Sequence, residues 1–214
     1  MTIDQSKLQK KPIYDFFKRL FDLISSGLAI ILLSPILILL LLIKFFEDFH
    51  NPIYISQRIG KGGKPFPFIK IRSMKPKAEL MKQEMIEQGL NEADGPAFKM
   101  KEDPRITPFG KFIRKWSIDE ILQLVNVFLG HMSIVGPRPP LPQEVALYTE
   151  EQKQRLLVKG GLLCLWQIQP DRHSISFEDW VKLDMEYIEK RSFWLDMKII
   201  FTGAYMILSG KSGD

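Results

Sequence analysis

The sequence predicts a mixed α/β, helix-rich fold, with a re-entrant membrane helix near the N-terminus, interfacial amphipathic helices and a small β-hairpin. Three observations support this prediction. Residues 23–43 form an uncharged apolar run that is long enough to enter a bilayer. Residues 54–58 and 66–71 are short strand-type runs separated by a glycine-rich turn. Residues 109–129 carry apolar side chains at helical spacing.

The apolar run reads LISSGLAIILLSPILILLLLI. It is too long for the hydrophobic part of a cleaved signal peptide, and no small-residue cleavage site follows it. Ser34 and Pro35 lie just past its centre, where a proline removes a backbone donor and kinks a helix. Lysines and arginines flank both ends, so the positive-inside rule places both ends in the cytoplasm. We therefore predict a helix that enters the membrane, bends at Ser34 and Pro35 and returns, with a spanning helix as the alternative.

Two further segments are expected at the bilayer surface. Residues 1–22 mix phenylalanines with lysines, which predicts an amphipathic helix at the level of the headgroups. Residues 193–208 are apolar and aromatic with few charges, which suits an interfacial helix and a core helix equally well. The chain therefore divides into a membrane part, residues 1–50, and a domain outside the bilayer, residues 51–214.

Composition excludes some classes of site. The chain of 214 residues has a formal net charge of +5, which suits nucleic acid, anionic lipid or a phosphorylated substrate but selects none of them. A single cysteine, Cys164, excludes an internal disulfide and a cysteine-based zinc site. His50, His131 and His173 lack the spacing of metal ligands.

A pair of adjacent acids, Asp119 and Glu120, lies inside the predicted helix 109–129. Ser117 is a good N-cap, and Glu120 completes the S-x-x-E pattern of a capping box. Both acids would then lie in the first turn of a helix, where the helix dipole favours anions. On pattern alone this structural role is favoured, and it is compatible with chemistry on a phosphate, which a helix N-terminus also attracts.

Cationic side chains mark three places that suit a phosphate. Lys70 and Arg72 follow the second strand of the hairpin, although a solvated strand edge would explain them as well. The glycine-rich turn between the strands lacks the spacing of a phosphate-binding loop. Arg138 stands between Pro137 and Pro139, and because prolines stiffen the backbone, its guanidinium is held ready for bidentate phosphate binding.

Three stretches of this chain carry a family resemblance: QRIGKGGKPFPFIKIRSM (57–74), EDPRITPFGKFIRKWSIDEILQLVNVFLGHMSIVGPRPPLPQEV (102–145) and, more loosely, residues 165–200. Because these stretches occur in this order, the chain resembles the bacterial sugar transferase family, the monotopic phosphoglycosyl transferases, in its small catalytic-module form. The resemblance covers nearly all of residues 15–205.

The resemblance implies transfer of a sugar-1-phosphate from a UDP-sugar to undecaprenyl phosphate, with release of UMP, as the first membrane step of bacterial glycan assembly. Asp119 would be the nucleophile that carries a covalent intermediate, and Glu120 would bind Mg2+. Residues 51–214 would be a catalytic domain on the cytoplasmic face of the bacterial inner membrane. The implied partners are the UDP-sugar, undecaprenyl phosphate, the bilayer and, as a further option, a second copy in a homodimer, without nucleic acid.

The same resemblance assigns roles to single residues. Arg114 would orient the phosphate or the acid pair, and Arg138 would contact a phosphate from its loop with Pro137 and Pro139. Lys70 and Arg72 are weaker members of the same cationic cluster. Asp184 matches an acid of the family that would assist the metal or the uridine, and Asp196 is a less certain match.

One departure concerns the sugar. The family pattern K-P-G-[IL]-T-G-L-W-Q-[VI]-S-G-R is replaced here by KGGLLCLWQIQPDR in residues 159–172, which puts the choice of sugar in doubt more than the chemistry. Two other functions remain open. The first is a non-enzymatic, basic membrane adapter. The second is an ordinary UDP-sugar glycosyltransferase, although its D-x-D metal motif is absent.

Overall fold

The computed structural model describes residues 11–92, 100, 102–169 and 175–209. Residues 1–10 of the predicted amphipathic helix, residues 170–172 of the altered loop and His173 lie outside them. The described chain forms, in order, α1 (Pro12–Asp48), β1 (Ile53–Ile59), η2 (Lys61–Gly63), β2 (Pro65–Ile71), α2 (Ala78–Glu87), α3 (Pro108–Lys115), η3 (Ile118–Glu120), α4 (Gln123–Phe128), β3 (Ser133–Val135), α5 (Pro142–Ala146), α6 (Glu150–Lys153), η4 (Gln154–Leu157), β4 (Gly161–Leu163), η5 (Trp166–Ile168), α7 (Phe177–Lys190) and α8 (Phe193–Leu208). The helix-rich α/β prediction is confirmed.

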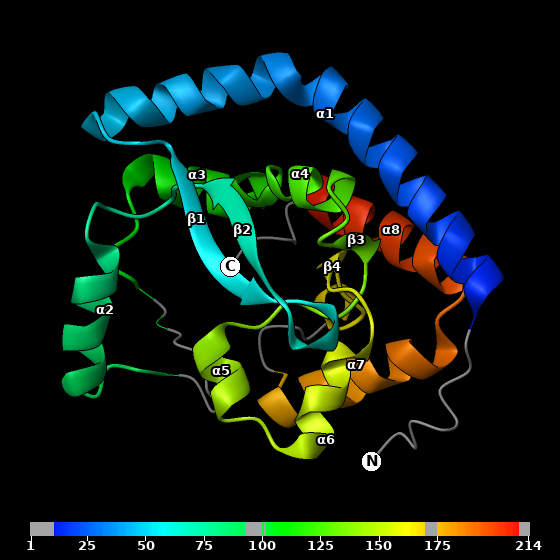
Figure 1. The fold of residues 1–214 in the computed structure, drawn as a ribbon. Coiled ribbons are helices and arrows are strands. Elements are labelled where there is room, and N and C mark those ends of the chain that lie inside the picture. Colours follow the sequence, from blue (N-terminus) through cyan, green and yellow to red (C-terminus); the bar gives the residue numbers. More distant parts are fainter. Residues whose placement is uncertain (1–10, 93–99, 101, 170–174, 210–214) are drawn as a thin grey trace.

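The long helix α1 arches over one side of the molecule (Figure 1). It begins with Pro12, whose missing N–H costs nothing in a first turn, and continues through Pro35. The Ser34 hydroxyl beside this proline donates a hydrogen bond to the carbonyl oxygen of Ile31 at 2.8 Å. Among the described residues α1 is the one helix long and apolar enough to cross a membrane, and only 17% of its most apolar window is buried. A core helix would be mostly buried, so α1 suits a membrane, and its re-entrant course stays a prediction.

Polar side chains on the inner face of α1 tie it to the rest of the chain at both ends. Near its start, Asp22 is buried and accepts hydrogen bonds from the Ser133 hydroxyl and the Ile134 N–H at 3.2 and 3.0 Å. Near its end, the buried Lys44 ammonium donates a hydrogen bond to the hydroxyl oxygen of Thr107, just before α3, at 3.2 Å. These contacts make α1 part of one folded unit rather than a flexible anchor.

The predicted hairpin is confirmed. β1 and β2 are antiparallel with Ile53 opposite Ile71, and the turn between them places Gly62 and Gly63 at φ values of 69° and 76°. Such left-handed values favour glycine. The buried rings of Phe66 and Phe68 hold β2 in a small apolar cluster. A second, parallel pair joins β3 to β4.

The predicted continuous helix over residues 109–129 and its capping box are wrong. α3 ends at Lys115, Ser117 takes a left-handed φ of 53° without capping a helix, and the acid pair lies in the short 3-10 turn η3. The reason is tertiary. Ile113 and Ile118 pack on the same apolar cluster, but residues five apart on a straight helix point about 140° away from each other. The break at Ser117 brings both to that cluster.

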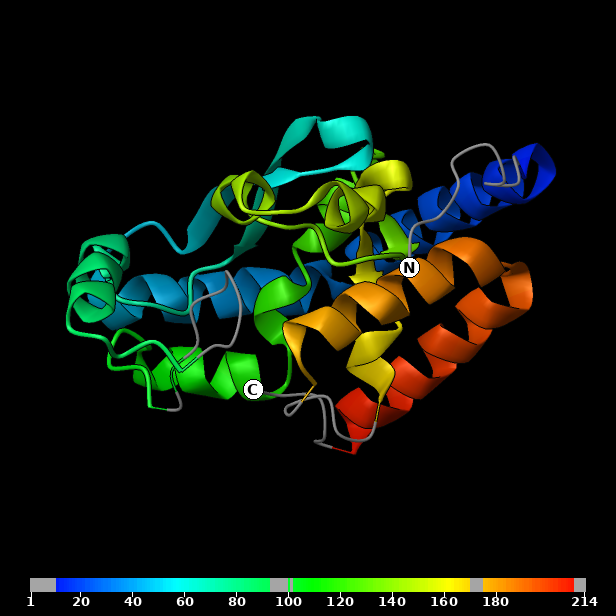
Figure 2. The same cartoon turned by 90° about the horizontal axis from the view of Figure 1, so that it is seen from below.

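The predicted helix 193–208 is confirmed as α8, and it has two different faces. Ile199 is fully buried in an apolar core shared with α7, and the two helices lie together in Figure 2. On its other face Trp194, Phe201 and Leu208 are 80%, 71% and 84% exposed. One face of α8 therefore packs in the core, and its opposite face is an exposed apolar surface.

Candidate active site

Asp119 is the buried member of the acid pair. Its side chain belongs to η3, which contacts both α3 and β2. Burial, followed by the charge of Glu120, raises the pKa of Asp119 to about 6. Lys70 and Arg114 act in the opposite direction and favour the ionised carboxylate. The site therefore holds a carboxylate that is ionised at neutral pH and more basic than an exposed one.

Glu120 faces a different cation. Its Oε1 lies 3.3 Å from Nη1 of Arg138, and both side chains remain partly exposed. The sequence predicted that Glu120 and Arg138 share a site, and the structure brings them together although 18 residues separate them. Glu120 is therefore paired with Arg138, while the charge of Lys70 acts on both carboxylates.

The loop that carries Arg138 is held from both sides. The N–H of Gly161 donates to the carbonyl oxygen of Pro137 at 2.8 Å, and the N–H of Ile59 donates to that of Pro140 at 2.9 Å. The approach to β4 is so close that a Cβ on Gly161 would lie 2.0 Å from the nitrogen of Gly136. Pro137 and Pro139 are buried. Arg138 therefore projects from a rigid support.

The described part of the altered loop 159–172 belongs to this support. A Cβ on Gly160 would lie 2.5 Å from Cγ of Pro139, so no larger residue fits there without a shift. The Ser133 N–H donates to the carbonyl oxygen of Gly160 at 2.8 Å. The described part of this loop therefore helps to fix the position of Arg138. Residues 170–172 lie outside the described part of the chain.

Lys70 lies in the cluster, and Arg58 joins it although sequence reasoning missed that residue. Burial lowers the pKa of Lys70, which the charge of Asp119 opposes, and its ammonium lies 5.4 Å from the ring of Tyr54. Burial and then the nearby Arg138 lower the pKa of Arg58 to about 10. Its Nη1 donates to the carbonyl oxygen of Pro139 at 3.1 Å. Strand alternation could have identified Arg58, because the hairpin register places it on the same face as Lys70.

Arg72 lies elsewhere, which corrects its assignment to the cationic cluster. Its two terminal nitrogens each contact an oxygen of the Asp48 carboxylate at 2.6 Å, and its Nε donates to the carbonyl oxygen of Asn51 at 2.7 Å. Arg72 follows the last residue of β2, where strand alternation no longer governs its direction. It fastens the end of α1 to the hairpin.

Asp184 is fully buried in an ion pair with Arg155. Nε and Nη2 of Arg155 lie 2.7 and 2.6 Å from Oδ2, while Oδ1 has no hydrogen-bond partner in the described part of the chain. Burial raises the pKa of the nearby Cys164 thiol, and the charges of Asp184 and Glu120 act in the same direction. The role of Asp184 toward a metal or uridine stays a prediction. Asp196, the less certain match, binds Lys18 at 2.7 Å and joins α8 to α1.

The donor set suits Mg2+ that arrives with a phosphorylated substrate. Among the described residues no group of three or more His, Cys, Asp or Glu could hold a metal by itself. Mg2+, however, is commonly bound by one or two carboxylates together with substrate phosphates and water. Glu120, whose side chain keeps 21% of its exposure, fits as the protein ligand, with Asp119 beside it.

The chain is similar to known proteins over most of its length. The model of the family described as bacterial sugar transferase matches residues 13–210. Galactosyl transferase CpsE of Streptococcus agalactiae is 40% identical over 193 residues, which are 90% of this chain and 42% of that protein. The undecaprenyl-phosphate galactose phosphotransferase of Salmonella typhimurium is 38% identical over 195 residues, 90% of this chain and 40% of that protein.

The exopolysaccharide production protein ExoY of Rhizobium meliloti is 35% identical over 193 residues, 89% of this chain and 85% of that protein. The chain therefore spans about two fifths of the length of the first two relatives and most of the length of ExoY. Because the family match extends from the start of α1 to beyond the end of α8, this chain belongs to the bacterial sugar transferase family.

Proposed function

We propose that this chain transfers a sugar-1-phosphate from a UDP-sugar to undecaprenyl phosphate through a covalent intermediate on Asp119. The observation that carries the proposal is the buried Asp119 carboxylate, set beside Glu120 among four cations: Arg58, Lys70, Arg114 and Arg138. Four cations against two carboxylates leave an excess of two positive charges. The diphosphate of a UDP-sugar is negatively charged, so this excess of positive charge would attract it.

In the first step an oxygen of the Asp119 carboxylate attacks the phosphorus that bears the sugar. The bond from this phosphorus to the oxygen shared with the second phosphate breaks, and UMP leaves with that electron pair. Positioning and charge neutralisation account for most of the catalysis of phosphoryl transfer. The pKa of about 6 suits this role, because Asp119 is ionised at neutral pH yet keeps the higher basicity that favours attack.

In the second step a phosphate oxygen of the lipid carrier attacks the same phosphorus. The bond to Asp119 breaks, the carboxylate is regenerated, and the product is a lipid diphosphosugar. A covalent intermediate splits the transfer in two. UMP can therefore leave before the carrier arrives, and the water-soluble donor and the lipid acceptor need not occupy the site together.

The residues around Asp119 have separate tasks in this scheme. Arg138, fixed on its loop, binds a phosphate of the donor or of the carrier, and Arg114 and Lys70 neutralise charge at the reacting phosphorus. Mg2+ bound by Glu120 would supply Lewis-acid neutralisation of the diphosphate. The apolar outer faces of α1 and α8 support a position at a membrane surface. We place the chain at the cytoplasmic face of the inner membrane, where the carrier would be reached from the headgroup level.

UMP release by the purified full chain in detergent tests the proposal, with undecaprenyl phosphate, Mg2+ and either UDP-galactose or UDP-glucose. Asp119→Asn should abolish release while the protein stays folded. Asp179→Asn, an exposed acid on α7, is the matched control and should keep full activity. Without the carrier, the unaltered chain should gain the mass of one hexose phosphate, and Asp119→Asn should not.

The other outcomes separate the competing functions. UDP in place of UMP as the product would identify an ordinary glycosyltransferase. Membrane binding without nucleotide release across several UDP-sugars would indicate an adapter. Near-normal UMP release by Asp119→Asn would show that another group is the nucleophile.

A further inference from the structure

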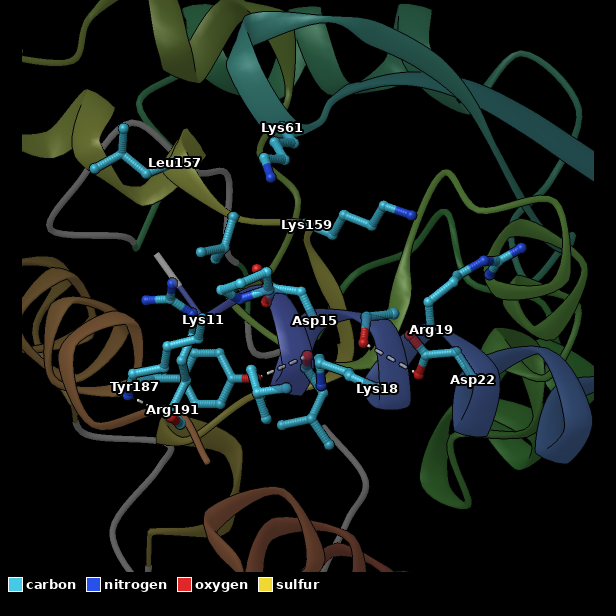
Figure 3. Close-up of a pocket in the computed structure, with 15 residues that line it drawn as sticks. Lys11, Asp15, Lys18, Arg19, Asp22, Lys61, Leu157, Lys159, Tyr187 and Arg191 are labelled. Atoms are coloured by element: carbon cyan, nitrogen blue, oxygen red, sulfur yellow. Dashed lines mark hydrogen bonds between the residues drawn. The ribbon is translucent and has the colours of Figure 1, made fainter. Parts of the chain in front are cut away.

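A polar cavity lies against the first turns of α1. Its volume is about 390 Å³, and it is enclosed by α1, by Lys61 of the hairpin turn, by the segment ending at Lys159 and by Arg191. Figure 3 shows Lys61 and Lys159 across the cavity from Asp15, Lys18 and Asp22 of α1. Neither Asp119 nor Glu120 nor Arg138 belongs to its lining. The cavity is therefore separate from the candidate active site.

The lining has an excess of positive charge. Its carboxylates are Asp15 and Asp22, whereas its cations are Lys11, Lys18, Arg19, Lys61, Lys159 and Arg191. Some of these cations already have protein acceptors, since Lys18 binds Asp196, and Arg19 donates to the carbonyl oxygens of Val127 and Phe128 at 2.7 Å. Lys61 and Lys159 form no hydrogen bond or ion pair with any described residue.

Lys159 is held near another cation at a partly buried position. Its Nζ and Nη2 of Arg19 lie 3.5 and 3.3 Å from the point that a Cβ on Gly130 would occupy, so the two nitrogens are less than 7 Å apart. Burial lowers the pKa of Lys159, and the charges of Arg19 and Lys61 act in the same direction, while the charge of Asp22 offsets part of this effect. An anion in the cavity would relieve this repulsion and satisfy both lysines.

We propose that this cavity binds a phosphate group, and that the group belongs to the headgroup of an anionic phospholipid. A phosphate offers several acceptor oxygens to cations that approach from opposite walls. The helix that forms one wall also carries the neighbouring apolar surface, because Ile13, Phe16 and Phe17 on its outer side are 74%, 66% and 60% exposed. Such a helix lies among lipid headgroups, which places the cavity beside them. A free phosphate shares the same chemistry and is the other source to be tested.

Native mass spectrometry of the detergent-solubilised full chain can count bound lipids. The chain is titrated with phosphatidylglycerol, with phosphatidylcholine and, separately, with inorganic phosphate. The double variant Lys61→Gln/Lys159→Gln removes the two cations that have no partner among the described residues. Lys64→Gln/Lys153→Gln changes the net charge equally at exposed positions outside the cavity and is the matched control.

We expect one phosphatidylglycerol to bind in preference to phosphatidylcholine, with its Kd raised at least about tenfold in the cavity variant and unchanged in the control. Binding of inorganic phosphate alone, lost in the same variant, supports the site with a soluble source. Equal binding of the two lipids without phosphate binding, or an unchanged Kd in the cavity variant, overturns the proposal. Asp119→Asn should bind the lipid normally, so failure of the proposed chemistry and failure of this site are distinguishable.

Discussion

Replacing Asp119 by asparagine should stabilise the folded chain at neutral pH while it removes activity. The pKa of Asp119 rises from its ordinary value of 3.8 to about 6 on folding, because burial and Glu120 disfavour the charged form. The folded state thus binds the proton more tightly than the unfolded chain, so this carboxyl costs stability as the pH rises from about 4 to about 6. A difference of about two pKa units corresponds to about 3 kcal/mol above pH 7.

Thermal unfolding in detergent between pH 4 and pH 7.5 measures this effect. For a chain of this size, about 3 kcal/mol should raise the Tm of Asp119→Asn by about 6–12 °C at pH 7.5. The gain should shrink toward zero at pH 4, where the carboxyl of the unaltered chain is protonated. Asp179→Asn, at an exposed position, should show no such gain.

A gain that is the same at every pH would show that asparagine improves packing rather than removing a charge. A loss of stability at neutral pH would refute the reasoning more directly. It would mean that Lys70 and Arg114 stabilise the ionised carboxylate by more than burial and Glu120 destabilise it, and the pKa would then lie below its ordinary value.

Three further outcomes are expected. The kcat/KM of UMP release should fall as the pH drops below about 6, because the nucleophile Asp119 becomes protonated; a pH–rate profile without a decline there would contradict its role. Gly110→Ala should destabilise by at least about 2 kcal/mol in thermal unfolding, since the new Cβ would lie 1.9 Å from the carbonyl oxygen of Ser73. Gly89→Ala, in open space at φ of 73°, should cost only about 1 kcal/mol. Arg155→Met should cost about 3–5 kcal/mol by leaving Asp184 buried without its partner, and Arg155→Met/Asp184→Leu should regain most of it; a folded double variant that has lost UMP release would give Asp184 a role in the reaction.

Local patterns predicted the elements whose conformation depends on nearby residues. Alternation and a glycine turn are enough to specify the hairpin, because antiparallel strands joined by a short turn find their register locally. Two prolines predicted a stiff Arg138 loop, and in the folded chain hydrogen bonds from Gly161 and Ile59 also hold it. The S-x-x-E pattern wrongly predicted a helix cap at Ser117. The pattern describes only four consecutive residues and takes no account of packing against the rest of the chain. Here the apolar cluster with Leu37 and Leu40 of α1 decided the path instead.

The sequence alone was sufficient to predict the family, the acid pair and the membrane-suited helix. Each of these predictions depends on residue types within short stretches of the chain. The pairing of each cation with a particular acid depends on contacts between residues far apart in the sequence. Arg72 is two residues from Lys70 in the chain, yet it pairs with Asp48 at the end of α1, whereas Lys70 and Arg58 face the acid pair from one side of the hairpin. Opposite charges attract at any sequence separation, so only the packed structure determines their partners.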